Sequence, residues 1–346
     1  MDLIDRVTPT GLLGTGRRVL VLLSGGRDSV CLLDLAVRIA GSGHVAALHC
    51  NYGLRDAADA DERHCAALCE RLGVELHVRR PLRPVRAGGE PAGTQPTSRA
   101  GSQPASPTGR GRGRGSNNLQ AWARDARYAA AIEIALARGG DIAAGHTASD
   151  QVETVLYRLA ASPGRRALLG MAARDGRLVR PLLGVSREET GAHCTARGLA
   201  WCEDAGNDTP AFARNRVRHD LLPALRSLHP AAEQNVLSTL DLLRDEAAVL
   251  DSLVDEQLAL AGDPPPLAVL RDMRPALRRL ALQRLADRAA GGRAPAIGHR
   301  APEVFALAEG GALDVGGGLR AEVHGGALRF GASRGPAAPH PYPARP

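Results

Sequence analysis

The stretch RVLVLLSGGRDSVCLLDLA, residues 18–36, places a Gly-rich elbow between a short apolar run and an amphipathic segment. Arg18–Leu23 is typical of a buried strand, and a helix is expected to follow the elbow. Within the elbow, Ser24–Ser29 (SGGRDS), the glycines Gly25 and Gly26 let backbone N–H groups approach a polyanion closely. The N-terminus of the following helix adds partial positive charge. The segment therefore predicts a phosphate-binding loop, and its spacing excludes a Walker A loop.

The chain around this loop alternates short apolar runs with amphipathic segments. We expect strands at Arg18–Leu23, His44–Cys50, Val74–Val78 and Asp141–Ala144, and helices at about Asp28–Ala40, 56–72, Asn118–Arg138 and Ala148–Ala160. Strands separated by helices imply right-handed crossovers and a parallel sheet, so the predicted fold class is α/β. Ligands of such sheets bind beyond the carboxyl ends of the strands, and the polar motifs fall at those ends. We therefore expect one shared site there.

Three domains are expected along the chain. They are an N-terminal α/β domain over 1–218, a helical domain over 219–295, and a small C-terminal β module over 296–335. In the helical domain Leu and Ala recur at helical spacing over 220–227, 231–261 and 265–290. In the β module, Gly310–Gly331 alternates apolar and polar residues around Gly turns, which predicts a hairpin. Residues 336–346 are expected to be a disordered tail.

One segment interrupts the first domain. Residues 84–116 are rich in Gly, Pro, Ser, Thr and Arg, and show no hydrophobic periodicity. Such a segment buries too little apolar surface to offset its ordering entropy, so we expect a disordered insertion. Its Arg-Gly repeats leave two interpretations open, namely contact with a nucleic acid and a plain tolerated insertion.

Composition restricts the classes of partner and compartment. All 44 basic residues are Arg, and the net charge of +7 fits either a polyanionic partner or an Arg-rich solvated surface. The six cysteines contain no CxxC pair, and Cys65 and Cys69 on one helix face are expected to pack. No apolar run approaches the roughly 20 residues that span a bilayer, and no signal peptide pattern opens the chain. We expect a cytoplasmic protein with no membrane partner.

A second acidic motif follows the fourth strand. In Gly145–Thr154 (GHTASDQVET), Thr147 and Asp150 fit a capping box, so a helix is expected from about Ala148. Asp150 and Glu153 then share a face of that helix close to His146. Either these acids serve as ligands, or Thr147 and Asp150 only cap the helix and Glu153 is a surface acid.

Three basic or polar segments complete the set of motifs. They are Asn51–Arg55 (NYGLR), Asn118–Tyr128 (NLQAWARDARY) and Phe212–Pro223 (FARNRVRHDLLP). Arg124 and Arg127, spaced i and i+3, share a helix face suited to phosphate. Taken alone, the first segment is also typical of a Gly turn, and the other two of solvated helices.

These motifs resemble those of a known enzyme family in the same order. SGGRDS matches the SGGxDS signature of the PP-loop ATP pyrophosphatases, which cleave ATP between the α and β phosphates. NYGLR resembles the NHGLR element of the tRNA(Ile)-lysidine synthetases, with Tyr52 in place of His. GHTASDQVET resembles their GHxxDDQxET motif, with Ser149 in place of the first Asp. The resemblance covers about residues 16–225 apart from the insertion.

The resemblance implies a fold, a reaction and a set of site residues. The fold is that of the adenine nucleotide alpha-hydrolase-like PP-loop domains, with accessory domains that bind tRNA. In the implied reaction ATP adenylates the wobble cytidine of tRNA(Ile) with a CAU anticodon, and free L-lysine displaces AMP to give lysidine. A homodimer suits the family.

Site residues carry over by motif. The implied ATP-binding residues are Ser24, Gly25, Gly26, Arg27, Asp28 and Ser29, with Asp28 also holding Mg²⁺. Catalysis is implied for Asp28, His146, Asp150, Glu153 and Arg214, and lysine binding for Asp150 and Glu153. The implied tRNA-binding residues are Arg55, Arg124, Arg127, Arg216 and Arg218.

Two other functions remain open from the sequence. One is a PP-loop tRNA thiolase, although such enzymes commonly use CxxC cysteines that this chain lacks. The other is a non-catalytic tRNA-binding relative, which the changes at Tyr52 and Ser149 allow. ATP–pyrophosphate exchange with and without tRNA separates catalysis from binding alone.

Overall fold

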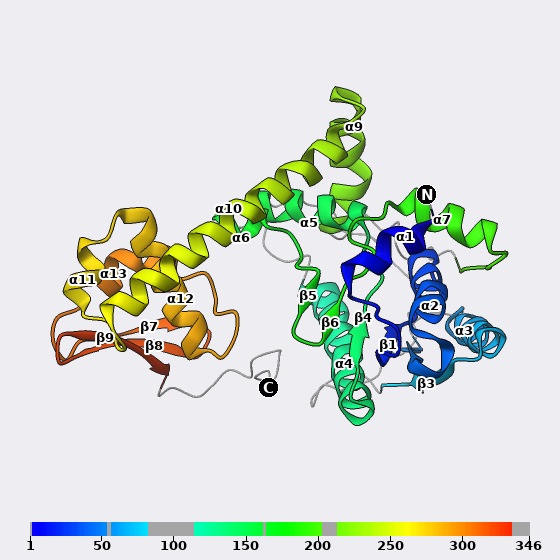
Figure 1. The fold of residues 1–346 in the computed structure, drawn as a ribbon, viewed down its shortest axis with the longest axis horizontal. Helices are drawn as coiled ribbons and strands as arrows, with labels where there is room; N and C mark the ends of the chain where they lie inside the picture. The colour runs from blue at the N-terminus through cyan, green and yellow to red at the C-terminus, as the bar shows by residue number, and fades with distance from the viewer. Residues whose placement is uncertain (1, 54–56, 82–113, 162–163, 203–212, 334–346) are drawn as a thin grey trace, which may run out of the picture. The chain divides into compact units, whose positions relative to one another are not determined.

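The computed structural model describes residues 2–53, 57–81, 114–161, 164–202 and 213–333. The chain forms two compact units, Met1–Gln234 and Asn235–Pro346 (Figure 1). Residues 219–234 thus belong with the first unit, and the segments expected as a helical domain and a β module share the second. The division into three domains stays a prediction.

The first unit is built on a six-stranded sheet of order β3-β2-β1-β4-β6-β5. Its strands are β1 (Val19–Leu22), β2 (Val45–Cys50), β3 (Glu75–Arg79), β4 (Asp141–Ala143), β5 (Arg174–Asp175) and β6 (Leu178–Val179). Five strands run parallel and β5 pairs antiparallel with β6 at the edge. The predicted α/β fold class is confirmed. The sequence did not reveal β5 and β6, because strands of two residues are too short to show a period.

Helices cover both faces of this sheet. The helices of the first unit are α1 (Leu3–Val7), α2 (Arg27–Ala40), α3 (Ala58–Leu72), α4 (Arg114–Arg138), α5 (Ala148–Ala161), α6 (Arg165–Leu168), α7 (Arg187–Ala196), α8 (Ala213–Arg216) and α9 (Leu222–Leu228). A π-helical segment, Val217–Leu221, joins α8 to α9. The first strand shows the layering, because Val19 and Val21 pack with α2, α3 and α7 while Leu20 and Leu22 pack with α4. This alternation follows from the two-residue period of a strand.

The predicted insertion falls mostly outside the described residues, and its end needs correction. Helix α4 begins at Arg114 rather than near Asn118, so the last three residues of the segment 84–116 are helical. Gly115 and Ser116 are poor helix formers, which is why the sequence pattern placed the start later.

The second unit has one shared hydrophobic core. It contains α10 (Ala232–Ala261), which begins just before the unit boundary, then α11 (Leu267–Asp272), α12 (Pro275–Ala289), α13 (Ala301–Phe305), β7 (Ala312–Gly316), β8 (Leu319–His324) and β9 (Ala327–Ala332). The helix expected over 265–290 is broken at Met273 and Arg274, both extended, because Pro275 disfavours a helical residue before it. The expected hairpin is a three-stranded antiparallel sheet of order β7-β8-β9.

Within the described ranges, no helix combines the length and the apolar character that crossing a membrane demands.

Candidate functional site

A cavity of about 720 Å³ opens at the carboxyl ends of β1, β2 and β4. Its walls come from the segment after each of these strands, in particular Ser24–Ser29, His49–Tyr52 and Ala144–His146. From β1 the chain continues to β2 and β3 on one side of the sheet, and β4 lies on the opposite side of β1. The strand order therefore reverses at β1, and ligands of doubly wound sheets bind at such a topological switch point. The phosphate loop, the segment after β2 and His146 therefore share one cavity, whereas Asp150, Glu153 and Arg218 are not among its lining residues.

The phosphate loop is closed by its own two serines. Ser29 Oγ donates to the Gly26 carbonyl at 2.7 Å and accepts from the Ser24 backbone N–H at 3.2 Å. Ser24 Oγ lies 3.1 Å from Ser29 Oγ and accepts from the Gly26 N–H at 3.3 Å. Gly25 has φ +86°, which L side chains rarely adopt, so glycine is required there. The serines thus shape the loop as well as line the cavity.

Asp28 is held in place by helix α7. Thr190 Oγ1 lies 2.5 Å from Asp28 Oδ1, Arg187 Nε lies 3.4 Å from Oδ2, and Arg27 Nε lies 3.6 Å from Oδ1. Thr190 is fully buried, and its hydroxyl has a single proton for two acceptors, Asp28 and the Arg187 carbonyl at 2.9 Å. The Asp28 carboxylate is the nearer and the stronger acceptor, so the Thr190 hydroxyl donates its hydrogen bond to Asp28.

The start of α5 lies directly against the start of α2. A Cβ added at Gly145 would lie 3.1 Å from the carbonyl carbon and oxygen of Asp28 and 3.3 Å from the Ser29 nitrogen. These atoms are backbone and cannot move away cheaply. Gly145 therefore permits the close approach that brings His146 into the wall of the cavity.

The predicted capping box at α5 is present. Asp150 Oδ2 accepts from the Thr147 N–H at 2.9 Å and from its hydroxyl at 3.0 Å, and the helix begins at Ala148 as expected. Asp150 therefore does cap the helix. Glu153, however, is not a surface acid, because it is only 1% exposed.

The π-helical segment delivers an arginine to these acids. Arg218 donates from Nε and a terminal nitrogen to the two carboxylate oxygens of Glu153 at 2.6 and 3.0 Å, and lies 3.5 Å from Asp150 Oδ1. Burial disfavours the charged form of Arg218, but the hydrogen bonds to Glu153 outweigh it and raise its pKa. The tRNA-binding role implied for Arg218 stays a prediction, and its guanidinium is directed at the acid pair. π-Helical turns are frequent at functional sites.

The segment after β2 forms the turn that the sequence allowed. Asn51 Oδ1 accepts from the Gly53 N–H at 2.9 Å, and its amide nitrogen donates to Asp59 and Glu62 at 2.9 Å each. Tyr52 turns toward α4, where its hydroxyl donates to the Ala123 carbonyl at 2.7 Å. Burial raises the pKa of Tyr52 above its ordinary value, so this residue stays neutral.

The other predicted arginines lie in different surroundings. Arg124 and Arg127 stack over the Tyr128 ring, with guanidinium carbons 4.8 and 5.7 Å from its centroid, and Arg127 also lines the cavity. Arg216 on α8 is exposed. Arg55 and the side chain of Arg214 lie outside the described residues.

The thiols of Cys65 and Cys202 lie beside Gly25 of the phosphate loop. A Cβ added at Gly25 would lie 3.3 Å from Cys65 Sγ and 3.5 Å from Cys202 Sγ, and the Cys202 N–H donates to the Gly25 carbonyl at 2.9 Å. Burial raises the pKa of Cys65 to about 12, so it is a protonated packing group and no sulfur nucleophile. Among the described residues there is also no cluster of three or more His, Cys, Asp or Glu able to hold a metal ion.

The sequence missed part of this site. Thr190 belongs to no motif recognised in the sequence, and its contact with Asp28 is seen only in the structure. Arg187 and Cys202 lie in two segments that resemble the family's in order, Leu178–Arg187 (LVRPLLGVSR) and Trp201–Asp208 (WCEDAGND), but neither residue was assigned a role from the sequence. Gly145 was part of a quoted motif, yet its role depends on a backbone contact that sequence does not show.

Comparison with known proteins defines the class and then the family. Residues 5–225 match the PP-loop domain family, so the fold and the loop define a PP-loop protein. A solved U34-tRNA thiolase from Methanococcus maripaludis shares the fold, with TM-score 0.50 and 15% identity over 70% of this chain and 76% of that one.

Curated relatives narrow the class. This chain is 35% identical to the tRNA(Ile)-lysidine synthase of Symbiobacterium thermophilum over 96% of its own length and 70% of the relative's. It is 36% identical to the tRNA(Ile)-lysidine synthase of Gloeobacter violaceus over 74% of its own length and 72% of the relative's. Against that of Pseudomonas putida it is 35% identical over 76% of its own length, and spans 58% of the relative's. The chain belongs to the tRNA(Ile)-lysidine synthase family.

Proposed function

We propose that this protein ligates L-lysine to the wobble cytidine of tRNA(Ile) with a CAU anticodon, using ATP and releasing AMP and pyrophosphate. The observation that supports this most is the position of two different sites on adjacent strand ends. One is a loop suited to a triphosphate, after β1, and the other is an acid pair after β4, of which Glu153 is buried and Asp150 partly exposed. Family membership and the names of the relatives support the same reaction.

The loop after β1 is suited to the first half of the reaction, adenylation. Its backbone N–H groups and the start of α2 attract phosphate oxygens without any lysine side chain. Asp28 is the carboxylate positioned to hold Mg²⁺, which typically uses one or two protein carboxylates together with substrate phosphates. Mg²⁺ supplies charge neutralisation of those phosphates when bound.

The acid pair is suited to the second half, attack by lysine. Asp150 and Glu153 offer carboxylates to the ammonium of lysine, and Arg218 already pairs with Glu153. The tRNA contacts are proposed for Arg55, Arg124, Arg127 and Arg216, and catalytic roles for His146 and Arg214.

The test is transfer of labelled lysine. Purified protein is incubated with ATP, Mg²⁺, labelled lysine and tRNA(Ile) bearing a CAU anticodon, and label on the tRNA is measured. The matched control is the same tRNA with a uridine at the wobble position, which should stay unlabelled. If no label reaches the CAU tRNA while the protein is folded, the proposal is wrong.

The other functions considered from the sequence are not favoured. The protonated, buried Cys65 does not suit a thiolase. A non-catalytic relative has no evident need for a loop with both glycines, both serines and a positioned Asp28.

A further inference from the structure

Helix α7 places an arginine in the cavity to which the proposed function gives no role. Among the described residues, three arginines line the cavity, Arg27, Arg127 and Arg187. Arg27 and Arg127 belong to motifs already related to ATP or tRNA, whereas Arg187 is the first residue of α7 and ends the segment Leu178–Arg187. Its role has to be inferred from its contacts.

The Arg187 guanidinium lies beside the Asp28 carboxylate at ion-pair distance. Arg187 Nε is 3.4 Å from Asp28 Oδ2, and Arg27 Nε is 3.6 Å from Oδ1. Both distances are longer than the about 2.7–3.2 Å of an ordinary N–H···O hydrogen bond. The carboxylate accepts its hydrogen bond from Thr190 Oγ1, 2.5 Å away. Arg187 can therefore turn to another anion while Thr190 keeps Asp28 in place.

The backbone of Arg187 is fixed by the contacts of α7. The helix starts with a capping box, and Glu189 of that box also binds the Arg6 guanidinium of α1. Further along α7, His193 Nε2 lies 2.8 Å from Oδ2 of the buried Asp34 on α2. These contacts hold α7 against α1 and α2, so a rigid helix brings Arg187 to the cavity and its side chain is the part that moves.

The other two cavity arginines are packed against neighbouring groups. A Cβ added at Gly191 would lie 3.1 Å from Arg27 Cδ, so the stem of Arg27 runs along α7. Arg127 lies over a tyrosine ring of α4, 5.7 Å from its centroid. Within the described ranges, the side chain of Arg187 makes a single polar contact, the ion pair with Asp28. It is thus the cavity arginine best able to follow a ligand.

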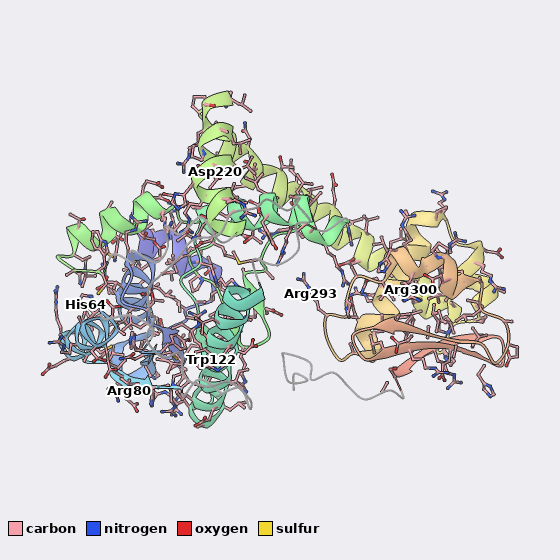
Figure 2. All side chains as sticks on the ribbon, turned by 180° about the vertical axis from the view of Figure 1, so that it is seen from behind. His64, Arg80, Trp122, Asp220, Arg293 and Arg300 are labelled. Carbon is pink, nitrogen blue, oxygen red and sulfur yellow. The ribbon has the colours of Figure 1, made fainter. Side chains whose placement is uncertain are left out.

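The opposite side of the loop presents no permanent cation to Gly25 in the part of the chain that the structure describes. The side-chain atoms nearest to a Cβ added at Gly25 belong to Cys65, Cys202 and His64. His64 is on α3 and is labelled in Figure 2, and it is not among the residues that line the cavity. Permanent positive charge at the loop therefore comes from the side that faces α7.

We propose that Arg187 is a further catalytic residue, which binds the two terminal phosphates of ATP and stabilises them as they leave as pyrophosphate. Asp28 is the carboxylate proposed to hold Mg²⁺, and a Mg²⁺ held in this way also binds phosphate oxygens of the substrate. A side chain in contact with Asp28 is therefore within reach of the same phosphates. The proposal rests on the proposed function and names the residue that receives the leaving group.

The step concerned is adenylation. The carbonyl oxygen of the cytidine forms a bond to the α phosphorus of ATP, and the bond from that phosphorus to the oxygen bridging the α and β phosphates breaks. The electron pair of the broken bond stays on the bridging oxygen, which leaves as part of pyrophosphate. A guanidinium donates two parallel hydrogen bonds to phosphate oxygens. Arg187 therefore stabilises the negative charge that develops on the leaving group.

The first experiment measures the affinities for pyrophosphate and for AMP separately, by calorimetry on the full chain with Mg²⁺ present. Arg187→Met should weaken pyrophosphate binding roughly 10- to 150-fold, the range for loss of a charge-assisted hydrogen bond. AMP lacks the two terminal phosphates, so its affinity should stay within about threefold of wild type. Arg187→Lys keeps the charge without the planar fork and should recover part of the pyrophosphate affinity.

The matched control is Arg38→Met, which removes the same charge from the last turn of α2, outside the cavity wall. Both affinities should stay within about threefold of wild type in this variant, because the charge is distant and screened. The proposal is overturned if a folded Arg187→Met protein binds pyrophosphate as tightly as wild type, or if it loses affinity for AMP to the same extent. Absence of pyrophosphate binding by the wild type would overturn it as well.

The second experiment measures the rate of adenylation in a single turnover at saturating ATP. The rate for Arg187→Met should fall on the order of 100-fold, since the charge on the leaving group is largest in the transition state. An unchanged rate would contradict the catalytic role.

These outcomes are distinct from failure of the proposed function. Pyrophosphate binding is measured without tRNA and without lysine. If the wild type binds pyrophosphate through Arg187 but modifies no tRNA, the proposed function fails together with the catalytic role, while the phosphate contact stands. If the wild type makes lysidine and Arg187→Met binds pyrophosphate normally, the function stands and the inference about Arg187 fails.

Discussion

The frame of the phosphate loop and the carboxylates of Asp28 and Glu153 are all held by hydrogen bonds, but the partners come from different distances along the chain. Ser24, Gly26 and Ser29 bind one another within six residues. Glu153 is bound by Arg218, 65 positions away, and Asp28 by Thr190, 162 positions away. The frame of the loop is therefore set mainly by local contacts, whereas the orientation of Asp28 and Glu153 depends on tertiary structure.

Arg218→Ala should have the largest effect, because it breaks this long-range contact. It leaves the carboxylate of Glu153, which is only 1% exposed, without its guanidinium. Removal of one partner from a buried ion pair typically costs about 3–5 kcal/mol, and denaturant unfolding measures the loss.

The matched control is Arg216→Ala, two residues away and exposed, which should change stability by no more than about 0.5 kcal/mol. The double variant Glu153→Leu, Arg218→Met should recover much of the loss. If Arg218→Ala is as stable as Arg216→Ala, the ion pair is unimportant to the fold.

Thr190→Val tests the contact that holds Asp28. Valine matches threonine in shape and removes the hydroxyl, so a charge-assisted hydrogen bond worth about 1.5–3 kcal/mol is lost. The Asp28 carboxylate should then shift toward Arg27 and Arg187. The concentrations of Mg²⁺ and ATP that give half-maximal adenylation should therefore rise. Thr190→Ser restores the hydroxyl and should restore both dependences. Identical profiles for wild type and Thr190→Val would show that Asp28 needs no such positioning.

Gly145→Ala tests the close approach of α5 to the phosphate loop. The methyl group would lie 3.1 Å from the Asp28 carbonyl group, so the loop must shift, at about 1–3 kcal/mol. Affinity for ATP, measured by calorimetry, should fall. Gly184→Ala is the control, because its added Cβ has no heavy atom within 4 Å. Equal ATP affinity in the two variants would contradict the close contact.

Glu189→Gln should have the smallest effect, and it depends on pH. Burial disfavours ionised Glu189, but the Ser186 N–H at 2.7 Å and the Arg6 guanidinium outweigh it and lower the pKa of Glu189 below 4.5. A carboxyl group whose pKa is lower in the folded than in the unfolded state stabilises the fold at pH values above its unfolded-state pKa. This contribution is lost as the pH falls through its folded-state pKa.

The wild type should therefore exceed Glu189→Gln in unfolding free energy by less than about 1 kcal/mol at neutral pH, since the group is partly exposed. The difference should shrink below pH 4.5. A difference that grows on acidification would contradict the assignment.

The same contrast explains what the sequence could predict. The α/β class, the loop and the start of α5 at Ala148 depend on local periodicity and capping, and they are confirmed. The strands β5 and β6 were missed because two residues show no period, and Pro275 broke a helix expected to be continuous. Thr190 and the orientation of Arg218 were beyond reach, since the partner of a buried carboxylate is chosen by packing and not by spacing.

The most direct test separates the two halves of the proposed reaction. Wild type and Glu153→Gln are incubated with α-labelled ATP, Mg²⁺ and tRNA(Ile) with a CAU anticodon, first without lysine and then with it. The account predicts that both proteins place labelled AMP on the tRNA, because the phosphate loop is intact, and that only wild type releases it efficiently when lysine is added. If Glu153→Gln releases AMP as fast as wild type, the acid pair does not serve the lysine step.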